Sequence, residues 1–428
     1  MYMICGSAQI NKIAYTEYDL DNGLHVILHE DKATPIVVVS VMYHVGSKNE
    51  KPDRTGFAHF FEHLLFEGSK HIDRGEFDKH ITNAGGANNA YTSQDKTYYY
   101  ELLPSNQLEL GLWLESERMM HAKVDIKGVE TQREVVKEER RQRVDNQPYG
   151  TFQENAMKKV FKQHPYRWTP IGSMEHLDAA TEQDYIDFYN DFYTPNNAVL
   201  SIAGDIDIAE TKQLIDKYFS TIPVKKTDIY RPDIVEPELT EMTIDTVYDN
   251  IQLPGAIMTY RIPALGTKDF YAVNMLNTLL SGGASSRLNK AIVDEQQLAL
   301  FSGGFPSELE DPGVAIVFGI ANMGVDVMNL QNAIDQEIEK ARTELMSEDE
   351  FQKLRNQVES NFITGNARIA GIAESLANYY MYYGDTDLIN TELDRYLAVT
   401  KEDIRAAAQK YYDPNSRVIL HYLPHPTN

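Results

Sequence analysis

Short β-branched runs alternate with stretches of helical periodicity along this chain. The run 36–43 is apolar at every position except Ser40, and it predicts a buried central strand. Residues 13–30 predict two strands joined by the turn Asp21-Asn22-Gly23. Residues 88–92 and 97–102 predict two more strands on either side of a polar turn. Helical patterns fill most of the sequence between these runs, so the pattern favours an α+β fold.

Two parts of the chain repeat. Residues 181–200 match residues 400–419, which lie 219 positions later without a gap. Residues 57–65 match residues 271–279, which lie 214 positions later. Between the copies, residues 222–239 are rich in proline and charge and predict a linker. The chain is therefore predicted to contain one α+β unit twice.

The candidate metal-binding and catalytic residues lie in the first copy, in the segment His59-Phe60-Phe61-Glu62-His63. On a helix, His59 and His63 point the same way, one turn apart, and Glu62 lies beside that face. Two imidazoles and a carboxylate near one point are what a catalytic zinc site needs. Two histidines at this spacing can also be ordinary core or surface residues. The flanking phenylalanines and leucines predict a buried helix that ends near Gly68, and buried ionisable groups need a partner, which favours a metal.

The second copy contains the same predicted helix without the three candidate metal-site residues. Val273, Leu276 and Asn277 stand there at the positions of His59, Glu62 and His63. The repeated helix can therefore pack without the motif, so a purely structural explanation of the motif becomes less convincing.

A highly charged helix is predicted at residues 129–146. Its short apolar patch, Val135-Val136, indicates the buried face, and Glu139 lies four and three positions beyond these valines. Glu138 lies about 100° further round the helix. Glu139 is thus the glutamate predicted to face inward.

Length, charge and cysteine content limit the number of domains, the binding partners and the metal ligands that the chain can have. The 428 residues suggest two or more domains. A net charge of −24 argues against non-specific nucleic-acid binding, and no apolar run is long enough to predict a transmembrane segment. Cys5 is the only cysteine, so a zinc ion must be bound by histidine and carboxylate. Residues 1–9 resemble the end of a secretory signal but lack its basic region; we expect an exported, periplasmic location rather than a cytoplasmic one.

With these landmarks, the sequence resembles the pitrilysin/insulinase family of zinc metallopeptidases, the inverzincins, over nearly its whole length. It is most similar to the small two-domain branch that includes the mitochondrial processing peptidase subunits. The resemblance rests on GFAHFFEHLLFEG at 56–68, on the segments 85–92 and 133–139, and on SGGASSRL at 281–288. It implies two homologous domains, each a mostly antiparallel sheet packed with helices. We expect a catalytic zinc-binding domain at 13–221, the linker at 222–239 and a homologous non-catalytic domain at 240–428.

The resemblance also implies roles for single residues. His59, His63 and Glu139 would bind one Zn²⁺ per chain, and Glu62 would be the general base for zinc-activated water. The expected activity is endoproteolysis of peptides or unstructured polypeptide segments. In the family, substrate adds as a strand to a sheet edge, which here corresponds to the substrate-binding residues Gly86, Asn89, Ala90 and Tyr91.

Two departures from the family pattern qualify this expectation. Gln132 stands where relatives often carry a further glutamate, whose supporting role is absent or passes to Glu134 or Glu138. Full-length relatives also hold substrate with an arginine and a tyrosine seven residues apart, and residues 298–324 contain neither. A homologous partner chain would then supply that pair in a heterodimer; a homodimer is the alternative.

Two other functions are compatible with the sequence. One is a non-catalytic scaffold or assembly subunit, which predicts a degraded metal motif. The other is a peptide-binding module with a structural zinc, which usually requires four protein ligands where only three are found here.

Overall fold

A computed structural model of the chain describes residues 12–426. The predicted leader at 1–9 and Cys5 lie outside the described residues. Across 12–426, every helix is too short or too polar to span a bilayer.

The first half of the chain contains a six-stranded sheet. Its spatial order is β1-β2-β6-β3-β5-β4, and all neighbours are antiparallel except the parallel pair β2 and β6. The strands are β1 Thr16–Asp19, β2 His25–Glu30, β3 Ile36–Tyr43, β4 Ala87–Thr92, β5 Thr97–Pro104 and β6 Ala198–Gly204.

The second half contains a five-stranded sheet with the order β7-β11-β8-β10-β9. Without β1, the first sheet has this same order and the same single parallel pair, so the predicted duplication is confirmed. The mostly antiparallel α+β architecture is confirmed as well. The strands are β7 Thr243–Asp249, β8 Gly255–Arg261, β9 Ala299–Ser307, β10 Val314–Ala321 and β11 Arg417–Pro424.

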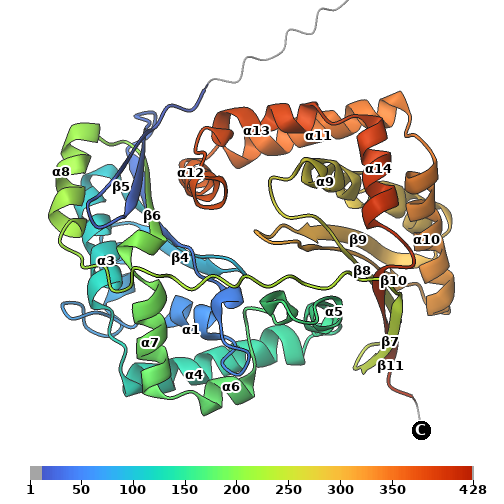
Figure 1. Cartoon of the computed structure of the whole chain (residues 1–428), viewed down its shortest axis with the longest axis horizontal. Coiled ribbons are helices and arrows are strands. Elements are labelled where there is room, and N and C mark those ends of the chain that lie inside the picture. The colour runs from blue at the N-terminus through green and yellow to red at the C-terminus, as the bar shows by residue number, and fades with distance from the viewer. Residues whose placement is uncertain (1–11, 427–428) are drawn as a thin grey trace, which may run out of the picture.

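Helices cover both sheets (Figure 1). In the first half they are α1 Phe57–Leu64, α2 Phe77–Asn83, α3 Leu108–His121, α4 Ile126–Arg140, α5 Phe152–Val160, α6 Met174–Ala179, α7 Glu182–Phe192 and α8 Ile208–Phe219. In the second half they are α9 Lys268–Ser281, α10 Val327–Thr343, α11 Glu348–Gly365, α12 Ile369–Tyr383, α13 Leu388–Leu397 and α14 Lys401–Tyr411.

The repeat is also visible at the ends of helices. α7 begins with a capping box between Thr181 and Asp184, and α14 begins with the same motif between Thr400 and Asp403. Each side-chain oxygen accepts one of the N–H groups that a helix start leaves without a partner. Each helix then leads into an inner strand of its sheet, β6 or β11.

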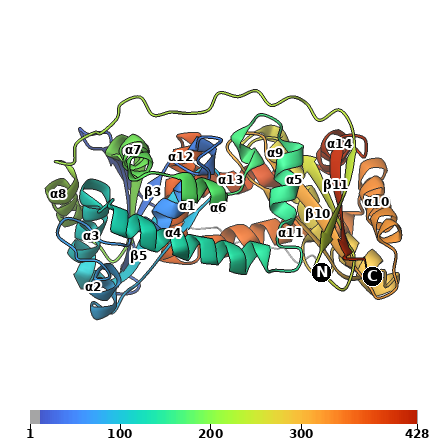
Figure 2. The same cartoon turned by 90° about the horizontal axis from the view of Figure 1, so that it is seen from below.

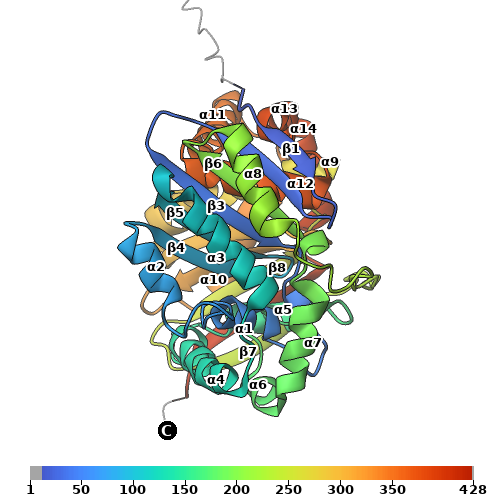
Figure 3. The same cartoon turned by 90° about the vertical axis from the view of Figure 1, so that its left-hand side faces the viewer.

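The apolar run of β3 is explained by burial on both of its faces. Alternate residues of a strand point to opposite sides of the sheet. Val37, Val39 and Val41 therefore join the large core that is covered by α1, α3 and α7. Figure 3 shows α3 and α8 on the outside of this sheet. Val38 and Met42 face the other way and pack against α12. The predicted buried central strand is confirmed.

The helix on that second face comes from the opposite half of the chain. α12 packs on β3 and β6, while α5 of the first half packs on β8 and β11 of the second sheet. The segment that joins the halves, residues 222–242, has no helix or strand and runs along one side of the molecule (Figure 2). Each sheet therefore completes its burial with a helix from the other half.

Because α12 covers the first sheet, truncating a single buried side chain of α12 should lower the stability of the whole chain. Leu376 is fully buried against the first sheet, so Leu376→Ala should lower the free energy of unfolding by about 2–5 kcal/mol. Urea denaturation followed by circular dichroism measures it. Leu345→Ala is the matched control, because Leu345 is 43% exposed and its truncation should cost less than about 0.5 kcal/mol. Equal losses in the two variants would contradict the role of α12.

Candidate functional site

The helix that carries the His-Glu-His motif has its N-terminus fixed by the carboxyl group of Glu50, six residues before Gly56. Gly56, with φ +95°, precedes α1, and its N–H donates to Glu50 Oε2 at 2.9 Å. Glu50 Oε1 accepts the N–H of Ala58, also at 2.9 Å. The carboxyl group satisfies N–H groups that the start of a helix leaves without partners, and burial raises the pKa of Glu50 to about 8. The helix ends at Leu64, four residues earlier than the expected end near Gly68.

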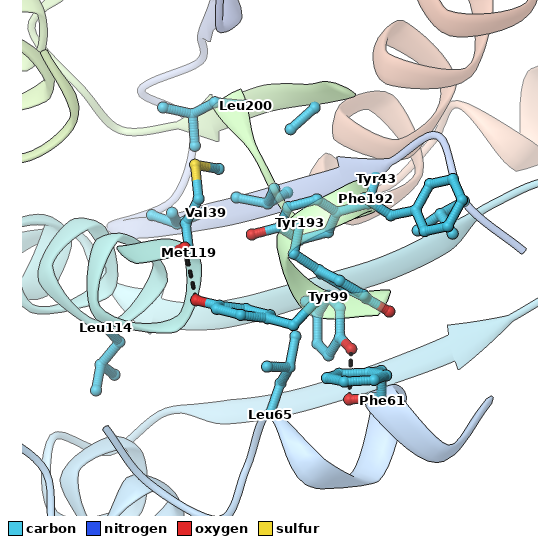
Figure 4. Packing of buried hydrophobic residues seen from close by; sticks show 14 of the residues in the cluster. Val39, Tyr43, Phe61, Leu65, Tyr99, Leu114, Met119, Phe192, Tyr193 and Leu200 are labelled. Carbon is cyan, nitrogen blue, oxygen red and sulfur yellow. Dashed lines mark hydrogen bonds between the residues drawn. The ribbon is translucent and has the colours of Figure 1, made fainter. Parts of the chain in front are cut away.

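One face of α1 is embedded in aromatic core. Phe57, Phe60 and Phe61 are almost completely buried, which confirms the predicted buried helix. The hydroxyl of Tyr99, on β5, donates to the carbonyl oxygen of Phe61 at 3.0 Å on the sheet side of the helix (Figure 4). Large side chains packed at native density allow little rotation, so the opposite face of α1 has a defined direction.

On that opposite face, three donor atoms from two helices converge. His59 Nε2 and His63 Nε2 lie 3.3 Å apart, and Glu139 Oε2 of α4 lies 3.4 Å from the first and 3.2 Å from the second. The two imidazoles beside Glu139 hold the pKa of its carboxyl well below its usual value. Glu139 was selected by helix face, and the structure brings it to both histidines.

Only one of the two valines that were expected to mark the buried face beside Glu139 is buried. Val136 is buried, but Val135 is 43% exposed and does not belong to the inward face. Regular α-helix also ends at Arg140, one residue after Glu139, and continues as a wider π-helical turn over Arg141–Asp145 rather than as α-helix to residue 146. Such widened turns occur often at functional sites.

The donor set fits zinc. Ligands bound tetrahedrally at about 2.0–2.1 Å lie about 3.3–3.4 Å from one another, and the three donor atoms here are 3.2–3.4 Å apart. Glu139 Oε2 is also buried and has no hydrogen-bond partner within residues 12–426. Two imidazoles and one carboxylate are ligands that zinc takes in catalytic sites.

Glu62 lies beside this trio but has a different partner. Its Oε2 accepts a hydrogen bond of 2.7 Å from the hydroxyl of Thr92, at the end of β4. A carboxylate oxygen of Glu62 and one nitrogen of each of His59 and His63 lie within 4.8 Å of one another. The carboxylate is therefore near the donor atoms and is oriented by the neighbouring strand.

A cavity of about 570 Å³ opens over these residues. It is lined by His59, Glu62, His63 and Glu139, together with the predicted strand residues Asn89, Ala90 and Tyr91. β4 pairs only with β5, so its other edge is free of sheet partners within the described chain.

Gly86, the fourth predicted strand residue, is not among the residues that line this cavity. It directly precedes β4, and a Cβ there would lie 2.5 Å from Leu103 Cδ2 and 2.8 Å from the carbonyl oxygen of Leu102. The structure thus explains Gly86 by the close approach of its backbone to β5.

The three residues considered for a supporting role lie away from the trio. Gln132 Nε2 donates to Glu67 Oε1 at 2.5 Å. Glu134 and Glu138 are exposed and pair with Lys137 and Arg141.

Two side chains near the site were missed. Thr92 could not be found from sequence, because its contact with Glu62 joins elements 30 residues apart. Arg143 Nη1 lies 2.8 Å from Glu139 Oε1, and the i,i+4 spacing of the pair was a usable signal.

The second copy shows how the same helix packs without these residues. Asn277 of α9, at the position of His63, is buried and accepts a hydrogen bond of 2.7 Å from Tyr412. Val273 and Leu276 are fully buried. The duplicated helix is therefore core in the second half.

Comparisons with known proteins agree with this architecture. Residues 25–171 match the family described as insulinase (peptidase family M16), and residues 179–358 match the domain described as the peptidase M16 inactive domain. The chain is 31% identical to the zinc protease PqqE of Helicobacter pylori over 408 residues, which cover 95% of this chain and 92% of that protein. It is 23% identical to a probable mitochondrial-processing peptidase subunit beta of Schizosaccharomyces pombe, over 93% of this chain and 89% of that one.

Solved structures show the same similarity in three dimensions. A protease from Helicobacter pylori superposes with a TM-score of 0.93 at 28% identity, covering 97% of this chain and 100% of that one. A peptidase M16 inactive domain from Pseudomonas fluorescens shares the fold with a TM-score of 0.85 at 17% identity, over 97% of this chain and 99% of that one. From the matched domains and the extent of these similarities, the chain belongs to peptidase family M16, the pitrilysin/insulinase family.

Proposed function

We propose that this chain is a zinc-dependent endopeptidase with one catalytic zinc, bound by His59, His63 and Glu139. The observation that carries the proposal is the convergence of three zinc-type donors beside an independently held carboxylate, Glu62, in one cavity. Three protein ligands leave a coordination position open, which distinguishes catalytic from structural zinc sites. Relatives named zinc proteases support the same chemistry.

The reaction divides between the metal and this chain's own residues. A zinc ion held there would act as a Lewis acid and make water nucleophilic near neutral pH. Glu62, as general base, takes the proton from the attacking water and returns it to the leaving amine. The Thr92 hydroxyl holds one carboxylate oxygen of Glu62, which leaves the other oxygen for the proton.

The free edge of β4 gives substrates a place to bind in extended form. Backbone groups of a peptide can pair with Asn89, Ala90 and Tyr91, which line the cavity beside Glu62. Pairing through the backbone makes few demands on side chains. We therefore propose peptides and unstructured polypeptide segments as the substrate class.

We further propose that the working enzyme pairs this chain with a different, homologous chain in a heterodimer; the alternative, a homodimer, would have to hold substrate without the arginine–tyrosine pair. Residues 298–324 of this chain contain no arginine and no tyrosine, so the pair that would hold substrate over the zinc has to come from elsewhere. Some similar proteins are named as subunits of a processing peptidase, which supports a partner.

A peptidase assay tests the proposal directly. Cleavage of a fluorogenic unstructured peptide is measured with and without a zinc chelator, for the chain alone and mixed with a candidate partner. Chelator-sensitive cleavage that returns on adding zinc is expected. Zinc bound without cleavage in any mixture would instead favour the peptide-binding module, and absence of both zinc and cleavage would favour the scaffold subunit.

Removing the hydroxyl of Thr92 should weaken catalysis and leave zinc bound. The hydrogen bond to the Glu62 carboxylate is charge-assisted, and its loss costs about 1.5–3 kcal/mol, or roughly 10–100-fold in kcat for Thr92→Val. Thr92→Ser keeps the hydroxyl and is the matched control. Steady-state kinetics and zinc content decide the matter; an unchanged kcat in Thr92→Val would refute the positioning role.

A further inference from the structure

A second group of metal-type side chains lies outside the cavity of the proposed active site. His71 belongs to the loop between α1 and α2, whereas Glu117 and His121 lie one turn apart near the end of α3. One ligand atom from each of the three residues lies within 4.8 Å of the others. None of the three lines the cavity over His59 and His63.

Main-chain hydrogen bonds hold the loop against the helix end. The N–H of Lys70 donates to the carbonyl oxygen of His121 at 3.0 Å, and the N–H of Lys123 donates to that of Gly68, also at 3.0 Å. An antiparallel bridge pairs Ser69 with Ala122 between these two bonds. The three candidate ligands are therefore brought together by backbone pairing before any ion binds.

The orientation of Glu117 is also set. Its Oε2 accepts a hydrogen bond of 2.5 Å from Ser69 Oγ, and Ser69 Oγ in turn accepts the N–H groups of His71 and Ile72 at 3.2 Å each. The remaining oxygen, Oε1, points to His71 Nδ1 at 2.9 Å. Carboxylates that bind a metal are usually oriented by hydrogen bonds of this kind from neighbouring groups.

The charge of this site is not balanced by a permanent cation. Glu117 is buried, and within residues 12–426 no lysine or arginine forms an ion pair with it; its one ion-pair partner is His71, whose side chain is 51% exposed. The imidazole of His121 makes no hydrogen bond within the same part of the chain and packs edge-on to His71 with ring centroids 5.3 Å apart. A buried carboxylate requires a positive partner, and a divalent ion between two imidazoles supplies one.

We propose that His71, Glu117 and His121 form a second zinc-binding site. Two imidazoles and one carboxylate select zinc over the hard cations calcium and magnesium, which prefer oxygen ligands. The exposed side of His71 gives the ion a path from solvent. A bound ion fastens the loop that follows the motif helix α1 to the end of α3, and this role is independent of the proposed peptidase activity.

Zinc counting on the full chain tests the proposal. Protein stripped with chelator is titrated with Zn²⁺ and its equivalents are measured by calorimetry and elemental analysis. We expect two equivalents for the unaltered chain, one for His71→Ala, one for His63→Ala and none for the double variant. His425→Ala, which removes an exposed histidine elsewhere, should retain two. Because the single variants empty different sites, failure here and failure of the active-site assignment give different results.

A thermal measurement gives a second reading that does not depend on activity. Zinc that binds only the folded state raises Tm, so zinc should raise the Tm of His63→Ala but not that of the double variant. His121→Asn serves if His71→Ala alters the loop. A single equivalent in the unaltered chain that His71→Ala keeps and His63→Ala loses, or two equivalents retained in both His71→Ala and His121→Asn, would overturn the second site.

Discussion

Glu62→Gln is expected to lower kcat by about 10²–10⁴-fold while the chain keeps its zinc, because general-base catalysis contributes a factor of this size. The glutamine side chain has the same shape and can still accept the Thr92 hydrogen bond through its carbonyl oxygen. It cannot take up a proton from water. Peptide cleavage measured together with zinc content by elemental analysis separates loss of the base from loss of the metal.

Glu138→Gln is the matched control for this change. Glu138 lies on the exposed side of α4, where it pairs with Arg141, and the substitution removes the same charge without touching the cavity. Its kcat should stay within about twofold of the unaltered chain, as expected for an exposed residue. If the Glu62→Gln variant kept full activity, the assignment of Glu62 as the general base would be wrong.

Glu139→Gln is expected to weaken zinc binding by more than about 100-fold, since even partners that only support a ligand cost 10–100-fold when lost. The amide has no charge to offset the ion, although it occupies the same place between His59 and His63. Activity should fall with the metal and return in part at high zinc. Competition with a chromophoric chelator measures the dissociation constant.

Glu134→Gln, on the same helix, provides the comparison. Glu134 is exposed and pairs with Lys137, so its loss removes a charge at the surface of α4 and leaves the donor trio intact. Zinc affinity should not change. Equal affinities for the two variants would show that Glu139 is not a ligand, and the third donor would then have to be sought elsewhere.

Much of the fold could be predicted because local patterns there agree with the tertiary structure. The β-branched run of β3 and the capping boxes of α7 and α14 indicate strands and helices in their own residues. The boundaries were less accurate. α1 stops at Leu64 rather than near Gly68, because the following turn tightens to i→i−3 bonds from the N–H of Phe66 to His63 and of Glu67 to Leu64. The charged helix instead widens after Arg140.

The site was predictable to the extent that its members share one helix face. The convergence of His59, Glu62 and His63 is predicted by helical spacing alone. Glu139 was predicted from a helix face marked by two valines, of which only Val136 is buried. The Thr92–Glu62 and His71–Glu117 contacts could not be predicted from the sequence, because each joins segments about 30 residues or more apart through side chains of common types. No sequence pattern distinguishes these side chains from ordinary surface residues.

By itself, the sequence determined the family, the duplication and the identity of the motif helix, since each rests on spacing within a continuous segment. Only the tertiary structure decided that Glu139 reaches both histidines, that no strand within residues 12–426 covers the edge of β4 beside them, and that α5 and α12 exchange between the two sheets. The physical reason is that these features depend on which faces of separate elements meet, and burial of apolar surface over the whole chain selects that pairing.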